Sequence, residues 1–231
     1  MKVHHFKTLD STNTKARDFS KNNLIVADTQ TKGRGRHKRQ WDSNKGGLWL
    51  SIVLEPKTKN PAELTFLAAV AVQKAIKRTT KLETKIKWPN DLLHKDKKLC
   101  GILTEAIFKG NSKKMIVGIG INVNNKLPIS LKSKATSIKE ILKKETNLKG
   151  LLTNLINQFN TLHKTYQEKG FIPILNKWKS SCDTIGKAIK VKTLKQRLVG
   201  KAIKVNKDCS LTIRLKNNKL KKIVEGDIFT V

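Results

Sequence analysis

The chain has 231 residues, and its 49 Lys and Arg against 17 Asp and Glu give a formal net charge of +32. Hydrophobic residues make up 38% of the chain, which is enough for a packed core and excludes a disordered tail, a collagen-like chain and a disulfide scaffold. No apolar run reaches the roughly 18 residues that a bilayer span needs, and the cysteines, Cys100, Cys182 and Cys209, form no CxxC pair. We therefore expect a cytoplasmic protein with reduced cysteines and no membrane partner, built from one large and one small domain.

The positive charge is spread along the whole chain. Residues 187–231 hold 13 basic and 3 acidic side chains, and basic residues also occur in every other segment. Lys outnumbers Arg heavily, whereas base recognition usually relies on Arg. Tyr166 is the only tyrosine, and no segment interleaves aromatic with basic residues as single-strand binders do. A solvated basic surface is the favoured interpretation, and a basic nucleic-acid-binding module remains an alternative function.

The first half of the chain predicts a helix, a strand, a loop, a second strand and a second helix, at residues 14–20, 24–28, 29–45, 47–54 and from 61 onward. Residues 11–13, Ser-Thr-Asn, are suitable to cap the first helix, and Pro61 is suitable to open the second. A further strand ends in the segment KWPND, residues 87–91, because Trp88 precedes a proline and must be extended.

The second half predicts a β-hairpin, a short helix, a long helical pattern and a group of short strands, at residues 98–123, 137–145, 148–181 and 187–231. Gly110-Asn111 is the expected hairpin turn, and Gly170 and Pro173 interrupt the long helical pattern. The change near residue 186 from a helical pattern to short strands predicts a boundary between a domain at 1–186 and a small antiparallel barrel at 187–231.

Standard nucleotide and metal motifs are absent from the sequence. No Walker P-loop exists, and the two segments that begin like the glycine-rich dinucleotide fingerprint fail at Lys38 and Val123. The histidines and cysteines show no metal-ligand spacing, so metal ligands cannot be named.

The loop at residues 33–41, GRGRHKRQW, is the most unusual segment. Five cations lie between Lys32 and Arg39, and an anionic ligand with several phosphates would offset their mutual repulsion. Trp41 offers a face on which a purine could stack. The alternative is a solvated surface loop with a buried Trp.

Three later segments also carry candidate groups. Asp91, after the rigid Trp-Pro pair, could orient an amine or hold Mg²⁺, unless it only closes a turn. Lys98, near the small Gly101, could point into a cleft, although a lysine at a strand start is often simply solvated. The strand at 118–124 contains glycines that allow another group to press on its backbone, or that only relieve its twist.

Together and in this order, these segments resemble the biotin protein ligases (biotin–acetyl-CoA-carboxylase ligases). The motifs are Ser-Thr-Asn, GRGRHKRQW, KWPNDLL, KLCGIL and GIGINVN, and they span residues 11–124. The resemblance implies an α+β fold: a mixed sheet with helices on one side, related to the class II synthetase catalytic domain, and a C-terminal SH3-like β-barrel. Lys38 departs from the family, which usually has Gly there, and this affects the expected loop conformation rather than the activity. Met1 lies ten residues before the first motif, which predicts the short form without a DNA-binding winged helix.

The resemblance also implies roles for individual residues. Those for biotin binding are Ser11, Thr12, Asn13, Gln30, Gly33, Arg34, Arg36, Lys98 and Gly101. Those for ATP binding are Arg34, Arg36, Arg39, Trp41, Asn90, Lys98 and Asn122. Those for catalysis are Lys98, Arg34, Arg36 and Asp91. Lys98 would bridge the biotin carboxylate and the α-phosphate, Trp41 would cover the adenine, and Asp91 would orient the acceptor lysine.

The implied reaction has two steps. Biotin and ATP form biotinyl-5′-AMP and pyrophosphate with Mg²⁺ as activator, and biotin then passes to a specific lysine of a biotin carboxyl carrier domain in a carboxylase or decarboxylase. A lipoate–protein ligase, which shares the fold and chemistry, is the closest alternative. We expect no sequence-specific DNA binding. The acceptor's identity and the formation of a homodimer are left open.

Overall fold

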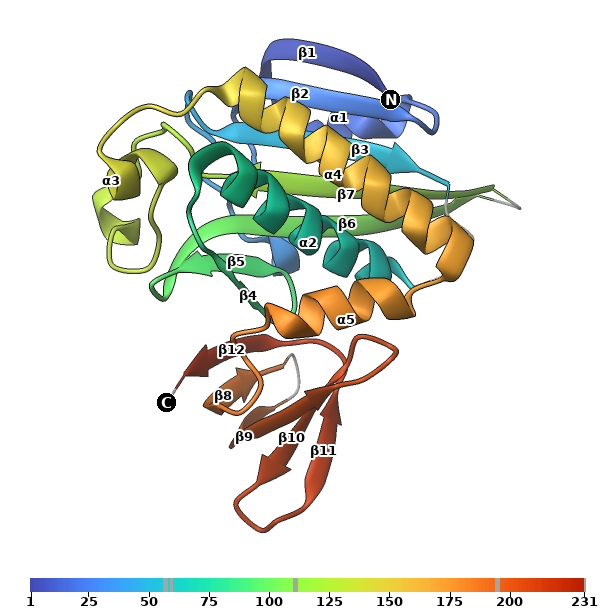
Figure 1. The fold of residues 1–231 in the computed structure, drawn as a ribbon, viewed down its shortest axis with the longest axis vertical. Coiled ribbons are helices and arrows are strands. Elements are labelled where there is room, and N and C mark those ends of the chain that lie inside the picture. The colour runs from blue at the N-terminus through green and yellow to red at the C-terminus, as the bar shows by residue number, and fades with distance from the viewer. Residues whose placement is uncertain (56–57, 59, 110–111, 194–195, 231) are drawn as a thin grey trace.

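The computed structural model describes residues 1–55, 58, 60–109, 112–193 and 196–230. Figure 1 shows a large mixed sheet with long helices packed against it and a small antiparallel sheet that follows in the chain. The α+β fold expected from the resemblance is therefore confirmed. Within the described residues, no helix is long and apolar enough to cross a membrane.

The large sheet has seven strands in the order β1-β2-β3-β7-β6-β5-β4. Their bounds are β1 Lys2–Leu9, β2 Asn23–Gln30, β3 Leu48–Leu54, β4 Lys85–Lys87, β5 Asp91–His94, β6 Lys97–Lys109 and β7 Ser112–Ile121. β1 and β2 are parallel, and the other neighbours are antiparallel. The predicted hairpin is confirmed as β6–β7, and its expected turn, Gly110-Asn111, lies outside the described residues. The sequence analysis did not predict β1 or β5.

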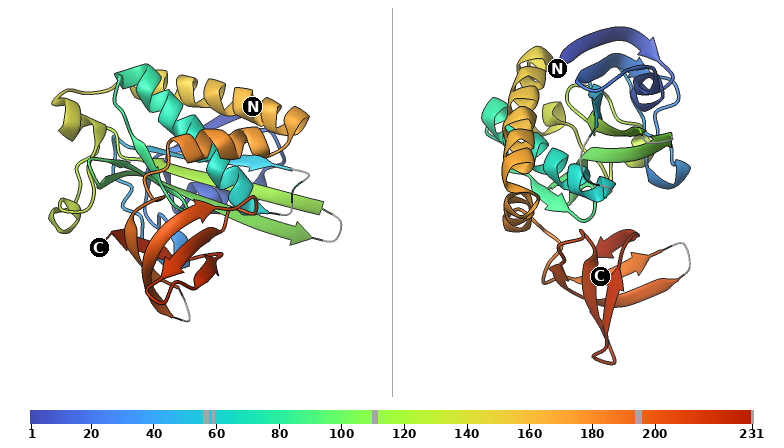
Figure 2. Two further views of the ribbon diagram at one scale, coloured as in Figure 1. Left: turned by 60° about the horizontal axis from the view of Figure 1, so that its bottom comes forward. Right: turned by 90° about the vertical axis from the view of Figure 1, so that its right-hand side faces the viewer.

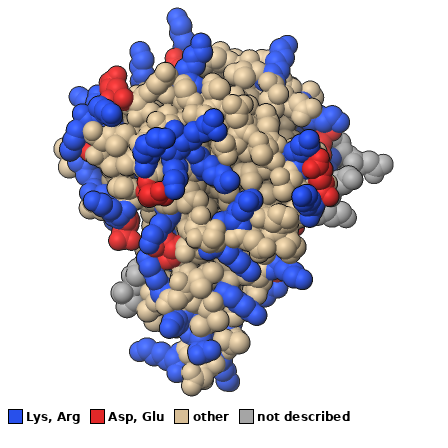
Figure 3. Space-filling view, in the orientation of Figure 1, with Lys and Arg blue, Asp and Glu red and all other residues tan. Residues whose placement is uncertain are grey.

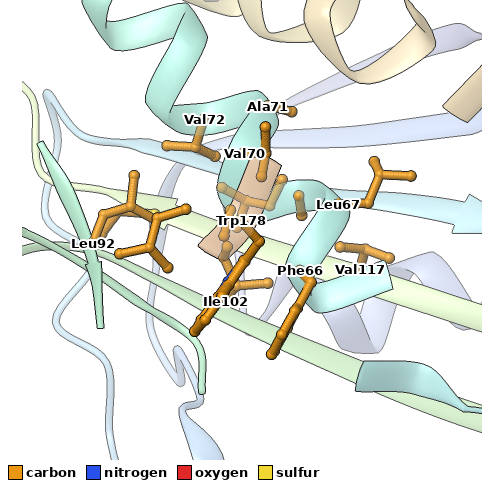
Figure 4. Packing of buried hydrophobic residues seen from close by; sticks show 14 of the residues in the cluster. Phe66, Leu67, Val70, Ala71, Val72, Leu92, Ile102, Val117 and Trp178 are labelled. Atoms are coloured by element: carbon orange, nitrogen blue, oxygen red, sulfur yellow. The ribbon is translucent and has the colours of Figure 1, made fainter. Parts of the chain in front are cut away.

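Three long helices cover one face of this sheet: α2 Pro61–Thr80, α4 Leu148–Lys169 and α5 Ile172–Ser180 (Figures 1 and 2). Alternate residues of a strand point to the same face, so Ile102 and Val117 reach this layer, as Figure 4 shows. There Phe66 of α2 stacks on Trp178 of α5 with ring centroids 4.1 Å apart. Burial of these large apolar side chains fixes the position of the helix layer.

Short helical turns from the start of the chain lie on the opposite face of the sheet. They are α1 Thr12–Lys15 and a 3₁₀ turn at Ala16–Asp18, so the helix predicted at 14–20 begins earlier and is shorter than expected. A small apolar cluster of Ala16, Ile25, Val53 and Ile116 holds these turns on the sheet.

The helical pattern at 148–181 forms two helices, α4 and α5, and the break between them lies at Gly170 as predicted. Gly170 ends α4 with a φ of 72°, a conformation that glycine adopts without a Cβ penalty. Pro173 lies in the first turn of α5, so it starts that helix and does not interrupt one. The short predicted helix is α3 Ile138–Leu142, where Ser137 and Glu140 form a capping box.

The small sheet has five antiparallel strands in the order β11-β10-β9-β8-β12. They are β8 Ala188–Lys192, β9 Arg197–Val205, β10 Leu211–Leu215, β11 Leu220–Ile223 and β12 Asp227–Thr230. The group of short strands predicted at 187–231 is present as these five strands. Trp88 Nε1 donates to the carbonyl of Cys209 over 2.8 Å, which ties this sheet to the end of β4.

Candidate active site

Three glycines of β6 and β7 face away from the helix layer. Gly101 and Gly120 are cross-strand partners, and Gly118 lies two positions from Gly120 on the same face. A Cβ at Gly118 would overlap the Asn13 side chain, and one at Gly120 would lie 2.5 Å from Trp41 Nε1. The predicted close approach to this backbone is confirmed. We call these three residues the glycine floor.

The arginine loop, residues 33–41, folds back on itself beside the glycine floor. Trp41 N donates to the carbonyl of Gly33 over 2.9 Å, and Gly35 N donates to the carbonyl of Arg39 over 2.7 Å. His37 and Lys38 adopt left-handed conformations, with φ of 54° and 58°. Lys38 therefore occupies backbone geometry that glycine adopts without strain, which gives a physical reason for the glycine usual in the resembling family.

Lys98, Asp91 and Trp41 meet at this floor. Lys98 Nζ lies 2.7 Å from Asp91 Oδ1 and 5.0 Å from the centre of the Trp41 ring. A Cβ at Gly101 would lie 3.0 Å from Trp41 and 3.2 Å from the Lys98 side chain. The lysine that sequence analysis placed near a cleft is thus held between a carboxylate and an aromatic face, with 31% of its side chain exposed.

The three arginines of the loop have separate anchors. Arg34 pairs with Glu105 of β6 at 3.2 Å, and Arg39 pairs with Asp227 of β12. Arg36 Nη1 donates to Asn90 Oδ1 over 3.1 Å and to the carbonyl of Gly226 over 3.3 Å. Asn90, which the resemblance assigns to ATP binding, therefore lies next to the loop. Since a guanidinium has five N–H donors, each arginine keeps donors for an anionic ligand.

Gln30 organises one side of the site. Its Oε1 accepts hydrogen bonds from Thr12 N at 2.7 Å and Thr12 Oγ1 at 3.1 Å, and its Nε2 donates to Ser43 Oγ over 2.7 Å. Ser11 precedes this contact and is 3% exposed. Gly33 lies against the same network, because a Cβ there would lie 3.2 Å from Gln30 Nε2. These predicted biotin-binding residues are brought together.

Asn13 connects this network to the arginine loop. Its amide donates to Glu105 Oε2 over 2.7 Å, and its Oδ1 lies 2.6 Å from Ser51 Oγ. Glu105 also receives Arg34, so a continuous polar path runs from α1 to the loop. Asn13 and Ser51 are buried and Glu105 is half-buried, where hydrogen bonds hold their geometry firmly, whereas Arg34 at the end of the path is exposed.

The side chain of Asn122, which the resemblance assigns to ATP binding, is buried in a hydrogen-bond network of its own. Its side chain is 3% exposed, its Nδ2 donates to the carbonyl of Thr136 over 3.2 Å, and its Oδ1 accepts from Asn125. Thr136 N in turn donates to the carbonyl of Lys98. The amide of Asn122 therefore holds the segment beside Lys98.

Sequence reasoning did not single out Ser43, Ser51, Glu105 or Asp227. Ser51 is the only polar residue of strand β3, and Glu105 lies on the same face of β6 as Gly101. The alternation of side chains along a strand could therefore have identified both residues. Asp227 is far away in the chain, and no local signal links it to Arg39.

Lys87 carries a shifted pKa at the edge of the site. Burial lowers its pKa from the ordinary value, Asp91 opposes this shift, and Lys98 adds to it. Its Nζ lies 5.7 Å from the centre of the Phe229 ring in β12. Lys87 therefore lies between Asp91, its cross-strand partner, and the small sheet.

The chain matches the biotin/lipoate A/B protein ligase family over residues 5–122. The bifunctional ligase/repressor BirA of Bacillus subtilis is 38% identical over 98% of this chain and 73% of its own length. The chain belongs to this family. Both findings confirm the resemblance to biotin protein ligases that the motifs indicated.

One solved structure and one further relative in sequence agree with this assignment. The biotin protein ligase of Aquifex aeolicus in complex with biotin and ATP has a TM-score of 0.88 at 31% identity, covering 99% of this chain and 97% of that one. The biotin–[acetyl-CoA-carboxylase] ligase of Paracoccus denitrificans is 29% identical over 80% of this chain and 82% of its own. The fold described above is therefore that of a ligase of this family.

Proposed function

We propose that this ligase activates biotin with ATP to biotinyl-5′-AMP and then transfers the biotinyl group to a lysine of a biotin carboxyl carrier domain. The observation that carries this proposal is the meeting of Lys98, Asp91 and Trp41 on the glycine floor beside the arginine loop. The chain also has the fold of a ligase whose structure contains biotin and ATP.

In the first step, a carboxylate oxygen of biotin attacks the α-phosphorus of ATP, and pyrophosphate leaves. Two anions must approach each other, so cations that offset their repulsion lower the barrier. In this proposal Lys98 contacts both groups, and Arg34 and Arg36 supply further guanidinium donors from the loop. Trp41 covers the adenine, and Arg39 and Asn90 complete the nucleotide side.

In the second step, the acceptor lysine attacks the activated carbonyl, AMP leaves, and the lysine nitrogen loses a proton. The Asp91 carboxylate forms an ion pair with an ammonium group in the structure, since Lys98 Nζ lies 2.7 Å from its Oδ1. We infer that it orients the acceptor amine in the same manner. No Ser or Cys nucleophile is needed.

The biotin ring is held by the network of α1 and Gln30. Ser11, Thr12, Asn13 and Gln30 present polar atoms that match the ureido group, and Gly33 and Gly101 leave room for close approach. We propose that Asn122 is a positioning residue that fixes the segment beside Lys98, rather than an adenine contact.

Mg²⁺ is proposed as part of the MgATP substrate. Among the described residues, no three His, Cys, Asp or Glu side chains come together as metal ligands. The carboxylates near the loop, those of Asp91, Glu105 and Asp227, are each paired with a cation. The donor set therefore does not fit a metal ion held by the protein, and no residue is assigned to one.

Two further proposals concern the whole chain. We propose a catalytic domain at 1–186 and a second domain at 187–231, because α5 ends at Ser180 and β8 begins at Ala188. We also propose a cytoplasmic location, since the reaction consumes ATP and the cysteines are free thiols.

The test is ATP–pyrophosphate exchange by the purified protein with MgATP and biotin, lipoate or no acid. Exchange that requires biotin supports the proposal. Exchange with lipoate alone would keep the mechanism and change the substrate. If neither acid supports exchange, the proposed adenylation is wrong.

A further inference from the structure

One face of the small sheet exposes an aromatic side chain among unpaired cations. Phe229 of β12 lies opposite Lys190 of β8, which lies opposite Val199 of β9. Partners in antiparallel strands point to the same side, so the three side chains form one row. Phe229 is 51% exposed and Val199 is 42% exposed.

The one acidic side chain beside this row among the described residues of β8, β9 and β12 is Asp227, the cross-strand partner of Lys192, and its carboxylate pairs with Arg39. Lys190, Lys192, Arg197 and Lys201 project to the same side of β8 and β9, because Lys192 pairs with Arg197 and Lys201 with Ala188. Within the described part of the chain, none of these four forms an ion pair with a carboxylate. We call the four cations, together with Phe229 and Val199, the docking face.

The docking face is continuous with the active site. Lys87 lies over the Phe229 ring, and its cross-strand partner is Asp91, whose carboxylate contacts Lys98. At the start of β12, Asp227 pairs with Arg39 of the arginine loop. A macromolecule seated on this face would thus lie beside the residues that receive the acceptor lysine.

We propose that the docking face binds an acidic surface of the acceptor domain and guides its lysine to Asp91. This inference rests on the proposed function, because it concerns the second substrate of that reaction. Lysine-rich surfaces attract an acidic partner over about a Debye length and raise the rate of encounter. Phe229 supplies the apolar contact that a purely electrostatic encounter lacks.

The surrounding surface distinguishes this face from the general positive charge. Figure 3 shows Lys and Arg scattered over the helix layer and the small sheet, with few acidic groups between them. The docking face differs because its cations surround an exposed aromatic ring and lie next to Asp91 through Lys87. A nucleic acid is the less favoured occupant, because a single exposed ring offers no series of stacking platforms.

The test uses a variant that carries Lys190→Glu, Arg197→Glu and Lys201→Glu in the full chain. Its control carries Lys74→Glu, Lys149→Glu and Lys177→Glu, three exposed lysines of the helix layer, and has the same net charge. The acceptor is the recombinant biotin carboxyl carrier domain of a bacterial acetyl-CoA carboxylase. We expect the KM for this acceptor to rise about tenfold in the first variant and to change less than about twofold in the control.

A second readout separates docking from chemistry. Biotin-dependent pyrophosphate exchange, and trapping of biotinyl-AMP by hydroxylamine, should be equal in both variants, since neither measurement involves the acceptor domain. Phe229→Ser should raise the acceptor KM without altering the dependence on NaCl, whereas the charge variant should flatten that dependence.

Three outcomes would overturn the inference. They are equal acceptor KM values in the two triple variants, a loss of pyrophosphate exchange confined to the docking-face variant, and inhibition of acceptor biotinylation only by single-stranded DNA at 150 mM NaCl. If wild-type protein shows no biotin-dependent exchange, the proposed function fails instead, so the two failures are distinguishable.

Discussion

At the scale of single residues, the ammonium group of Lys98 is the group that we propose acts in the first chemical step. It lies 2.7 Å from Asp91 and over the Trp41 ring, so packing and charge fix its position before any substrate contact. Because the repulsion between the biotin carboxylate and the α-phosphate is greatest when the two groups meet in the attack, Lys98→Ala should slow adenylate formation by about 100-fold and weaken biotin binding far less. Single-turnover formation of biotinyl-AMP and calorimetric binding of biotin measure the two effects.

Lys97→Ala is the control for this prediction, because the Lys97 ammonium points away and donates to the carbonyl of Lys132. We expect near wild-type adenylation from it. Equal losses of binding and rate in Lys98→Ala would make Lys98 a binding residue and contradict the catalytic role.

Lys38 has a backbone conformation that is unfavourable for a residue with a Cβ. Its φ of 58° lies in the left-handed region, which costs an ordinary residue about 1 kcal/mol. Lys38→Gly removes this cost but increases the freedom of the unfolded chain by a similar amount, so the free energy of unfolding should change by less than about 0.5 kcal/mol. Lys32→Gly, at a residue without positive φ, should lower it by about 0.5–1 kcal/mol. Urea unfolding of both variants checks the difference, and equal losses would contradict it.

At the scale of elements, the glycine floor explains why β6 and β7 can support the site. Gly120 has Trp41 Nε1 at 2.5 Å from the position a Cβ would take, so Gly120→Ala must displace the indole. We expect a loss of about 1–3 kcal/mol in the free energy of unfolding and at least about tenfold slower adenylation. Chemical denaturation and pyrophosphate exchange are the measurements.

Gly150→Ala in α4 is the matched control for Gly120→Ala. A Cβ there would meet its nearest neighbour at 3.5 Å, an ordinary contact, so stability and activity should not fall. A Gly120→Ala protein with wild-type exchange would show that Trp41 is not held by this contact.

Elements with a strong hydrophobic period were predictable from the sequence, and weak ones were not. α2 and the β6–β7 hairpin carry long apolar patterns and are confirmed. β1, with only exposed and half-buried residues, alternates too weakly to stand out, and α1 is shorter than the periods that identify helices.

The candidate site follows the same rule. The sequence places Lys98, Asp91 and the arginine loop in motifs, but their partners come from other elements. The contact of Arg39 with Asp227 joins residues 188 positions apart, and only the folded chain brings them together. Local motifs therefore identify candidate groups, while tertiary packing decides which of them meet.

At the scale of the whole molecule, contacts far apart in the chain hold the two sheets together. Trp88 Nε1 donates to the carbonyl of Cys209, and Asn60, the N-cap of α2, donates from its amide to the carbonyl of Asp208 over 3.2 Å. The turn at 206–210 is therefore a junction between α2 and the small sheet. Groups that hold this turn should influence the stability of the whole protein.

Asp208 is the group in this turn whose effect depends on pH. Lys222 contacts its carboxylate at 2.5 Å and Ser210 Oγ donates to it over 2.6 Å, and these contacts lower its pKa to about 2 from the model-peptide value of 3.8. A carboxyl group whose pKa falls on folding stabilises the protein above its unfolded pKa, and this contribution is lost as pH falls toward the folded pKa. Wild-type protein should therefore lose stability between pH 3.8 and about 2 through this group.

Asp208→Asn should lower the thermal midpoint at pH 6 and should reduce the further fall between pH 4 and pH 2, because the ionised partner of Lys222 is missing at both values. Glu168→Gln on α4 leaves the contacts of Asp208 intact and should retain the wild-type acid fall. Thermal unfolding followed by circular dichroism at each pH compares the three proteins. An Asp208→Asn protein with the full wild-type loss at low pH would show that acid acts elsewhere. Because the side chain is about half exposed, with 48% of its surface accessible, the effect should also shrink in high salt.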